Sequence, residues 1–142
     1  MADLIPDSHK DLIEGPVSAV LSTVMPDGQP QSTVIWCNYD GTHVLITTIS
    51  TFQKAKNMRA CPKVTLFAYR RNNPLRFIEI RGTVVEMTEE GAMEHLDQLA
   101  ELYTGKSPYY GEVQPIEWKD HETPVLCRIA PTHIVTKGGR SE

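Results

Sequence analysis

The chain has 142 residues, of which 40% are hydrophobic and 23% charged, and its formal net charge is −4. This length predicts a single domain, residues 1–142, with a core of its own. The net acidity argues against a nucleic-acid partner, and the lack of an apolar run of about 18 residues argues against a membrane span. The first residues lack a signal-peptide pattern, and three scattered cysteines, Cys37, Cys61 and Cys127, fit reduced thiols. We therefore expect a cytoplasmic protein without a metal site.

The first part of the chain predicts a short helix followed by an antiparallel meander. The helix spans residues 7–14 and ends at Gly15-Pro16. Pro26-Asp27-Gly28 and Asp40-Gly41 are strong turn signals between apolar, β-branched segments. The strands predicted on this basis are residues 17–25, 31–39 and 42–49.

A second helix is predicted over residues 50–61. Ser50 followed by Gln53 matches a capping box, and Pro62 ends the helix. One apolar edge is formed by residues that recur every three positions, namely Phe52, Ala55 and Met58.

The second half of the chain predicts three more strands and one longer helix. Thr88-Glu89-Glu90 starts this helix with acids in its first turn, and Gly105 ends it. Its apolar stripe consists of Ala92, Met93, Leu96, Leu99, Ala100 and Tyr103. The remaining predictions are strands over residues 63–69, 75–87 and 124–137, a loop over 106–123 and a flexible tail over 138–142. Six to seven strands joined mainly by hairpins, with two to three helices, predict a mainly β (α+β) antiparallel barrel.

Residues 41–78 contain seven basic side chains and no Asp or Glu. In an acidic protein this local positive field suggests a bound anion. The field begins where a predicted strand gives way to a helix, and the N–H groups of a helix start favour phosphate. The candidate ligands at this junction are Thr47, Thr48, Ser50, Thr51, Lys54, Lys56 and Asn57. The alternative is that Ser50 and Thr51 only cap the helix and the lysines are solvated.

Aromatic residues bear on what the phosphate is attached to. A planar ring can stack on an aromatic side chain, and the candidates are Trp36, Trp118, Tyr109 and Tyr110. The alternatives are that Trp36 is a core residue and that the two tyrosines form a dimer contact. No nucleophile, dinucleotide or P-loop motif is present, and the five histidines are isolated, so we expect them at the surface. Catalytic residues stay unassigned, which suits a protein whose cofactor carries the chemistry.

Several segments resemble the pyridoxamine phosphate oxidase-like split β-barrel proteins, and the resemblance covers nearly the whole chain. The most specific is KAKNMRACP (residues 54–62), which is typical of the small deazaflavin-dependent branch. The others are GPVSAVLST (15–23) with PDGQP (26–30), the segment 36–41, and IRGTV (80–84). One departure is Phe52, which stands where family members often carry an arginine, and it either packs against the cofactor or belongs to the core.

The resemblance implies a homodimer of the FMN-binding split-barrel type, with the cofactor in a groove between subunits. The implied activity is that of an oxidoreductase that binds coenzyme F420, a deazaflavin, and transfers a hydride to a small electron-poor organic substrate. The alternatives are an FMN-dependent oxidoreductase or flavin reductase, and a non-catalytic flavin-binding or sensor protein. The residues that the resemblance assigns to the cofactor are Thr47, Thr48, Ser50, Thr51, Lys54, Lys56 and Asn57 at the phosphate, Trp36 beside the ring, and Tyr110 of the partner's loop.

Overall fold

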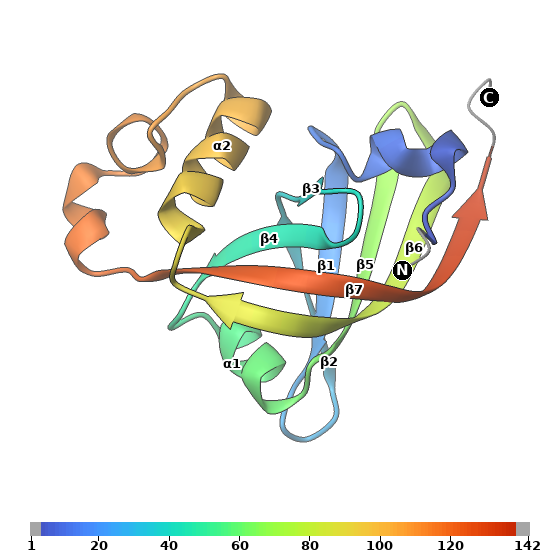
Figure 1. Ribbon diagram of the computed structural model, residues 1–142, viewed down its shortest axis with the longest axis horizontal. Helices are drawn as coiled ribbons and strands as arrows, with labels where there is room; N and C mark the ends of the chain where they lie inside the picture. The colour runs from blue at the N-terminus through green and yellow to red at the C-terminus, as the bar shows by residue number, and fades with distance from the viewer. Residues whose placement is uncertain (1–3, 139–142) are drawn as a thin grey trace.

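The structure is a computed structural model, and it describes residues 4–138 of the chain. Seven antiparallel strands form one sheet in the order β2-β1-β5-β6-β7-β4-β3, which curls into an open half barrel (Figure 1). The strands are β1 (Ser18–Val24), β2 (Pro30–Ile35), β3 (Asn38–Tyr39), β4 (Val44–Ile49), β5 (Lys63–Arg70), β6 (Asn73–Thr88) and β7 (Pro124–Lys137). This confirms the predicted mainly β split barrel.

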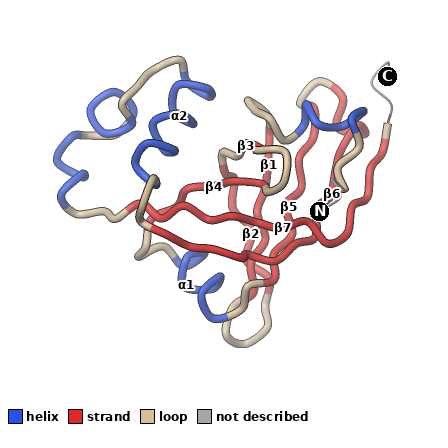
Figure 2. Tube along the Cα trace, in the orientation of Figure 1, coloured by secondary structure: helices blue, strands red, loops and turns tan. Residues whose placement is uncertain are grey.

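Helical segments are placed around the ends of the curved sheet (Figure 2). The two α-helices are α1 (Gln53–Ala60), which follows β4, and α2 (Ala92–Thr104), which follows β6. The shorter segments are η1 (Asp7–Leu12) at the start of the chain and η2 (Tyr109–Val113) and η3 (Ile116–Asp120) before β7. In the part of the chain that the structure describes, no helix is long and apolar enough to cross a membrane.

The sheet buries alternate residues of each strand, as strand geometry requires. Leu21 of β1 pairs with Leu66 of β5, which in turn pairs with Ile80 of β6, and all three side chains are buried. The opposite face of these strands carries a second apolar row. There Val20 pairs with both Val34 and Phe67, and none of these three side chains is fully buried.

Gly82 allows the two longest strands, β6 and β7, to approach closely. A Cβ atom at Gly82 would lie 2.8 Å from the carbonyl oxygen of Ala130 and 2.8 Å from a methyl carbon of Ile129. The register of the β6–β7 ladder shifts between Arg81 and Gly82. The glycine of the IRGTV segment therefore has a packing reason.

Two predicted helix starts are wrong. The helix predicted from Ser50 begins at Gln53, with Phe52 at the N-cap position and no capping side chain, because residues 50–51 form a turn instead. The helix predicted from Thr88 begins at Ala92, after a left-handed Gly91 (φ 79°). Thr88 instead accepts a hydrogen bond from the N–H of Glu90 (3.1 Å) within the turn.

Three further expectations are corrected by the structure. The second predicted strand is interrupted at Trp36 and Cys37, and the predicted loop over 106–123 contains η2 and η3. His9 and His95 are buried rather than at the surface, since each finds hydrogen-bond partners inside the fold. Of the predicted tail only Gly138 is described, and residues 139–142 lie outside the described part.

Candidate functional site

A hollow of about 170 Å³ lies where the ends of β2 and β4 meet the start of α1. The strand-to-helix junction predicted from the sequence therefore does line a concave site. Its polar lining residues are Thr47, Thr48 and Lys54, and its aromatic ones are Trp36, Phe52 and Tyr109.

Lys54 brings a positive charge to this hollow. Its ammonium forms no ion pair with any carboxylate among the described residues. Burial lowers the pKa of Lys54 below its ordinary value, because the charged form loses part of its hydration. A half-buried cation without a carboxylate partner is costly to the free protein, and an anionic ligand in the hollow would offset that cost.

Thr48, which also lines the hollow, carries a buried and unsatisfied hydroxyl. Its side chain is 6% exposed, and its Oγ1 has no hydrogen-bond partner. A buried hydroxyl without a partner costs about 1–3 kcal/mol, so such groups in folded proteins call for an explanation. A phosphate or a flavin-type ring accepts hydrogen bonds, and both the Lys54 ammonium and the Thr48 hydroxyl donate them. The residues present therefore fit a phosphorylated cofactor.

Thr47 is held by a buried histidine. Its Oγ1 lies 2.6 Å from Nδ1 of His95, whose Nε2 lies 2.8 Å from Oδ1 of Asn38. Burial, with a smaller effect of Arg128, lowers the pKa of His95 to about 4, so the ring is neutral at pH 7. Because Oδ1 of Asn38 accepts from Nε2–H, Nδ1 must accept the hydroxyl proton of Thr47. The free lone pairs of Thr47 are thus left to act as acceptors.

His95 is a site-supporting residue that the sequence analysis missed. It belongs to α2, which the sequence predicts as a plain amphipathic helix. The sequence does carry a signal that His95 is buried, because it lies beside the apolar stripe, one position before Leu96 and three after Ala92. A histidine on that face of the helix is buried together with the stripe.

Stacked aromatic rings form one wall of the hollow. Trp36 lies with its ring centroid 5.4 Å from that of Tyr103 at an interplanar angle of 17°, and Tyr109 meets Trp36 edge-on at 6.1 Å. The hydroxyl of Tyr103 donates to the carbonyl of Cys37 (2.9 Å) and accepts from its N–H (3.1 Å). Tyr103 thereby satisfies the backbone where the β2 and β3 segments separate, and it fixes Trp36 at the rim instead of in the core.

Phe52 lies at the edge of the hollow and is 43% exposed. It therefore does not belong to the core, which was one of the two interpretations of this departure from the family pattern. The position offers an apolar surface to a ligand where an arginine would offer a second charge.

Five of the predicted cofactor residues lie outside the lining of the hollow. Asn57 is 1% exposed, accepts from Gln53 (2.8 Å) and donates to Thr23 (3.0 Å), so its amide joins α1 to the sheet. Tyr110 is buried and donates to Glu122 (2.7 Å), while its neighbour Tyr109 lines the hollow from the same chain. The remaining three, at the turn and on α1, are Ser50, Thr51 and Lys56.

A curled antiparallel sheet with a helix inserted after its fourth strand, and with a concave site at that junction, defines the split-barrel class. The sequence profile described as pyridoxamine 5'-phosphate oxidase matches residues 5–136. The chain belongs to this family.

Solved structures agree with this assignment. One titled F420 reductase is 28% identical, with 92% of this chain and 98% of that chain covered and a TM-score of 0.79. A conserved hypothetical protein from Mycobacterium tuberculosis is 24% identical over 100% and 98% of the two chains, with a TM-score of 0.70. HupZ from Group A Streptococcus is 21% identical over 96% and 97%, with a TM-score of 0.68. These last two structures show the fold alone. No curated protein gives a significant match.

Proposed function

We propose that this protein is an oxidoreductase that binds coenzyme F420 in the hollow between β2, β4 and α1. The observation that carries the proposal is that one concave site is lined by both Lys54, whose ammonium has no carboxylate partner among the described residues, and Thr48, whose buried hydroxyl has no hydrogen-bond partner. The likeness to an F420 reductase at 28% identity supports the deazaflavin over FMN, which stays the alternative cofactor.

Each residue of the hollow has a distinct task in this proposal. The cofactor supplies a hydride to a small electron-poor organic substrate. Lys54 and Thr48 donate hydrogen bonds to its phosphate or ring oxygens, and Thr47, whose proton is directed to His95, accepts from a ring N–H. Trp36 and Phe52 cover apolar ring surface and exclude water from it.

We also propose a homodimer, because a hollow of about 170 Å³ is smaller than the range of about 300–1,000 Å³ usual for ligand pockets. A second copy would complete the groove. The apolar row Val34, Val20 and Phe67 on the outer face of the sheet offers the contact surface, and Val34 is 76% exposed. Three free cysteines, two of them buried, support a reducing cytoplasmic setting.

Titration of the purified protein with coenzyme F420 and with FMN, followed by fluorescence, tests the proposal. We expect micromolar binding of F420 and weaker binding of FMN. Turnover is then measured with reduced F420 and a panel of quinones, enones and nitro compounds. Tighter binding of FMN would move the assignment to a flavin enzyme, and binding without any turnover would favour a sensor. Binding of neither cofactor would reject the site.

A further inference from the structure

A second hollow, of about 500 Å³, lies on the other side of the stacked pair Trp36–Tyr103. Tyr103 lines this hollow, whereas Trp36 lines the candidate cofactor hollow, so the two stacked rings form a wall that the two hollows share. Its volume lies within the range of about 300–1,000 Å³ usual for small-molecule sites. None of the residues assigned to the cofactor lines it.

This second hollow is positively charged. Its basic lining residues are Arg70, the last residue of β5, and Arg71, in the turn that follows, and its one acidic residue is Asp11. The carboxylate of Asp11 is already shared between Arg76, at 2.9 and 3.0 Å, and Arg70, at 3.0 Å. These contacts hold the pKa of Asp11 below its ordinary value, so its carboxylate stays ionised. Because that carboxylate is bonded to Arg70 and Arg76, it does not pair with Arg71.

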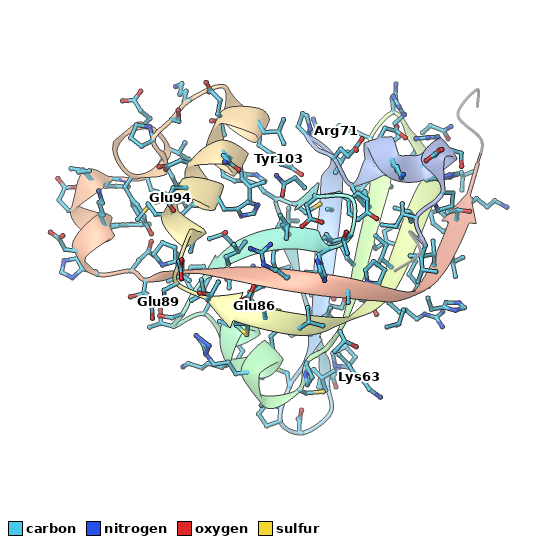
Figure 3. The ribbon with its side chains drawn as sticks, viewed as in Figure 1. Lys63, Arg71, Glu86, Glu89, Glu94 and Tyr103 are labelled. Atoms are coloured by element: carbon cyan, nitrogen blue, oxygen red, sulfur yellow. The ribbon has the colours of Figure 1, made fainter. Side chains whose placement is uncertain are left out.

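Arg71 is the free cation of this hollow. It is exposed, and it forms no ion pair with any residue in the described range 4–138. Figure 3 shows Arg71 at the β5–β6 turn and Tyr103 at the end of α2 on the same side of the molecule. Guanidinium groups bind carboxylates and phosphates through two parallel hydrogen bonds, so Arg71 is suited to an oxyanion.

The aromatic part of the hollow is fixed in place before any ligand arrives. The Tyr103 hydroxyl is bonded to the backbone of Cys37, and its ring is packed so closely on Gly15 that a Cβ there would lie 2.8 Å from the hydroxyl. Tyr69 adds a second phenol ring to the lining. Rigid aromatic walls beside a free guanidinium suit a planar organic anion, since little conformational entropy is lost on binding.

We propose that the Arg70–Arg71 hollow binds a planar organic anion, with its carboxylate or phosphate on Arg71 and its ring beside Tyr103. Two stacked rings lie between this site and the candidate cofactor hollow, which is too far for direct hydride transfer, so the anion is a ligand of a separate site and not the hydride acceptor. The binding itself does not depend on the cofactor. The site therefore selects a ligand class, aromatic or conjugated acids, over neutral molecules of the same shape.

Calorimetric titration of the cofactor-free protein with phenyl phosphate and benzoate tests this site. We expect at least one of them to bind, with neutral benzamide and inorganic phosphate about tenfold weaker or more. Arg71→Gln removes no hydrogen bond or ion pair between described residues and should weaken binding of the aromatic anion about tenfold. Lys63→Gln, an exposed cation at the other end of β5, is the matched control and should leave it unchanged.

The outcome is separable from that of the cofactor proposal. Arg71→Gln should leave F420 affinity unchanged, and Lys54→Ala should leave phenyl phosphate affinity unchanged. Failure of both aromatic anions to bind would overturn the inference whatever the cofactor result. Equal binding of benzamide, or an equal loss in Lys63→Gln, would overturn it as well, because either result would show that Arg71 makes no specific contact.

Discussion

The hydroxyl of Thr47 lies 2.6 Å from Nδ1 of His95, so a strand that lines the candidate cofactor hollow is bonded to a helix from the second half of the chain. The ring of His95 reaches Asn38 with its other nitrogen (2.8 Å). This line of three side chains leaves the hydroxyl oxygen of Thr47, a residue that lines the hollow, free to act as an acceptor, and the arrangement depends on a neutral histidine.

His95 should make the stability of the protein depend on pH. Its folded pKa is about 4 against an ordinary value of 6.5, so between these values the unfolded chain binds more protons. The free energy of unfolding should therefore fall as pH is lowered from about 6.5 to about 4, by at most about 3 kcal/mol from this group. Urea unfolding at several pH values measures this fall.

In His95→Gln, which keeps hydrogen-bonding capacity but does not titrate, this part of the pH dependence should disappear. His121→Gln removes an exposed histidine and is the control. Identical slopes for His95→Gln and the unaltered protein would show that His95 is not held neutral by the fold.

Lys54→Ala should weaken F420 binding by about 1.5–3 kcal/mol, the usual worth of a hydrogen bond to a charged group. Lys56→Ala removes the same charge from an exposed position outside the hollow, so it should bind F420 almost as the unaltered protein does. Fluorescence titrations at two salt concentrations compare the two variants. Equal losses would mean that only the general positive field of α1 matters, and that Lys54 makes no direct contact.

Thr48→Val should raise stability and lower cofactor affinity at the same time. Valine has nearly the shape of threonine, and it removes a buried hydroxyl that has no partner in the free protein, which should gain about 1 kcal/mol. The same change removes a donor that a bound cofactor would use. Thermal unfolding and F420 titration give the two readouts.

Thr33→Val is the matched control for this pair of effects. The Thr33 hydroxyl is also buried and without a partner, but it lies outside the hollow. Its replacement should give a similar gain in stability and no change in affinity. A Thr48→Val variant that binds F420 as tightly as the unaltered protein would remove Thr48 from the site.

The sequence was sufficient to predict most of the strands and to place the strand-to-helix junction to within a few residues, because hydrophobic alternation and turn residues are local signals. It placed Thr47, Thr48 and Lys54 at one site for the same reason. It could not show that the Asn57 amide is bonded to Gln53 and Thr23, since Thr23 lies 34 positions before Asn57 in the chain.

The aromatic wall shows the same limit. Trp36 and Tyr103 are separated by 67 positions, and only the curling of the sheet against α2 stacks their rings. Tyr109 and Tyr110 are adjacent in the sequence, and the tight turn of η2 decides that Tyr109 faces the hollow while Tyr110 turns to Glu122. Pattern alone does not distinguish such neighbours.

Asp11→Asn should destabilise the fold by about 3 kcal/mol, because it removes the carboxylate that faces a buried guanidinium. The side chain of Arg76 is 0% exposed, and Asp11 meets it with both oxygens. Glu79→Gln is the control, since its ion pair with Arg81 is at the surface and is worth at most about 1 kcal/mol. Chemical denaturation at pH 7 compares the two, and a loss for Asp11→Asn no larger than that for Glu79→Gln would contradict this view of Arg76.

The proposed homodimer predicts that a charge in the outer apolar row will separate the subunits. Phe67 pairs with Val20 in the sheet, and its ring centroid lies 5.0 Å from that of Phe77. Phe67→Glu would place a charge on this apolar face. Light scattering after size-exclusion chromatography should give a dimer for the unaltered protein and a monomer for this variant, with unchanged circular dichroism. Val85→Glu, at a 55% exposed apolar position outside the row, should stay dimeric. If the groove needs both subunits, the monomeric variant will also lose most of its F420 affinity. If the unaltered protein is itself a monomer and binds F420 fully, one chain is sufficient for binding.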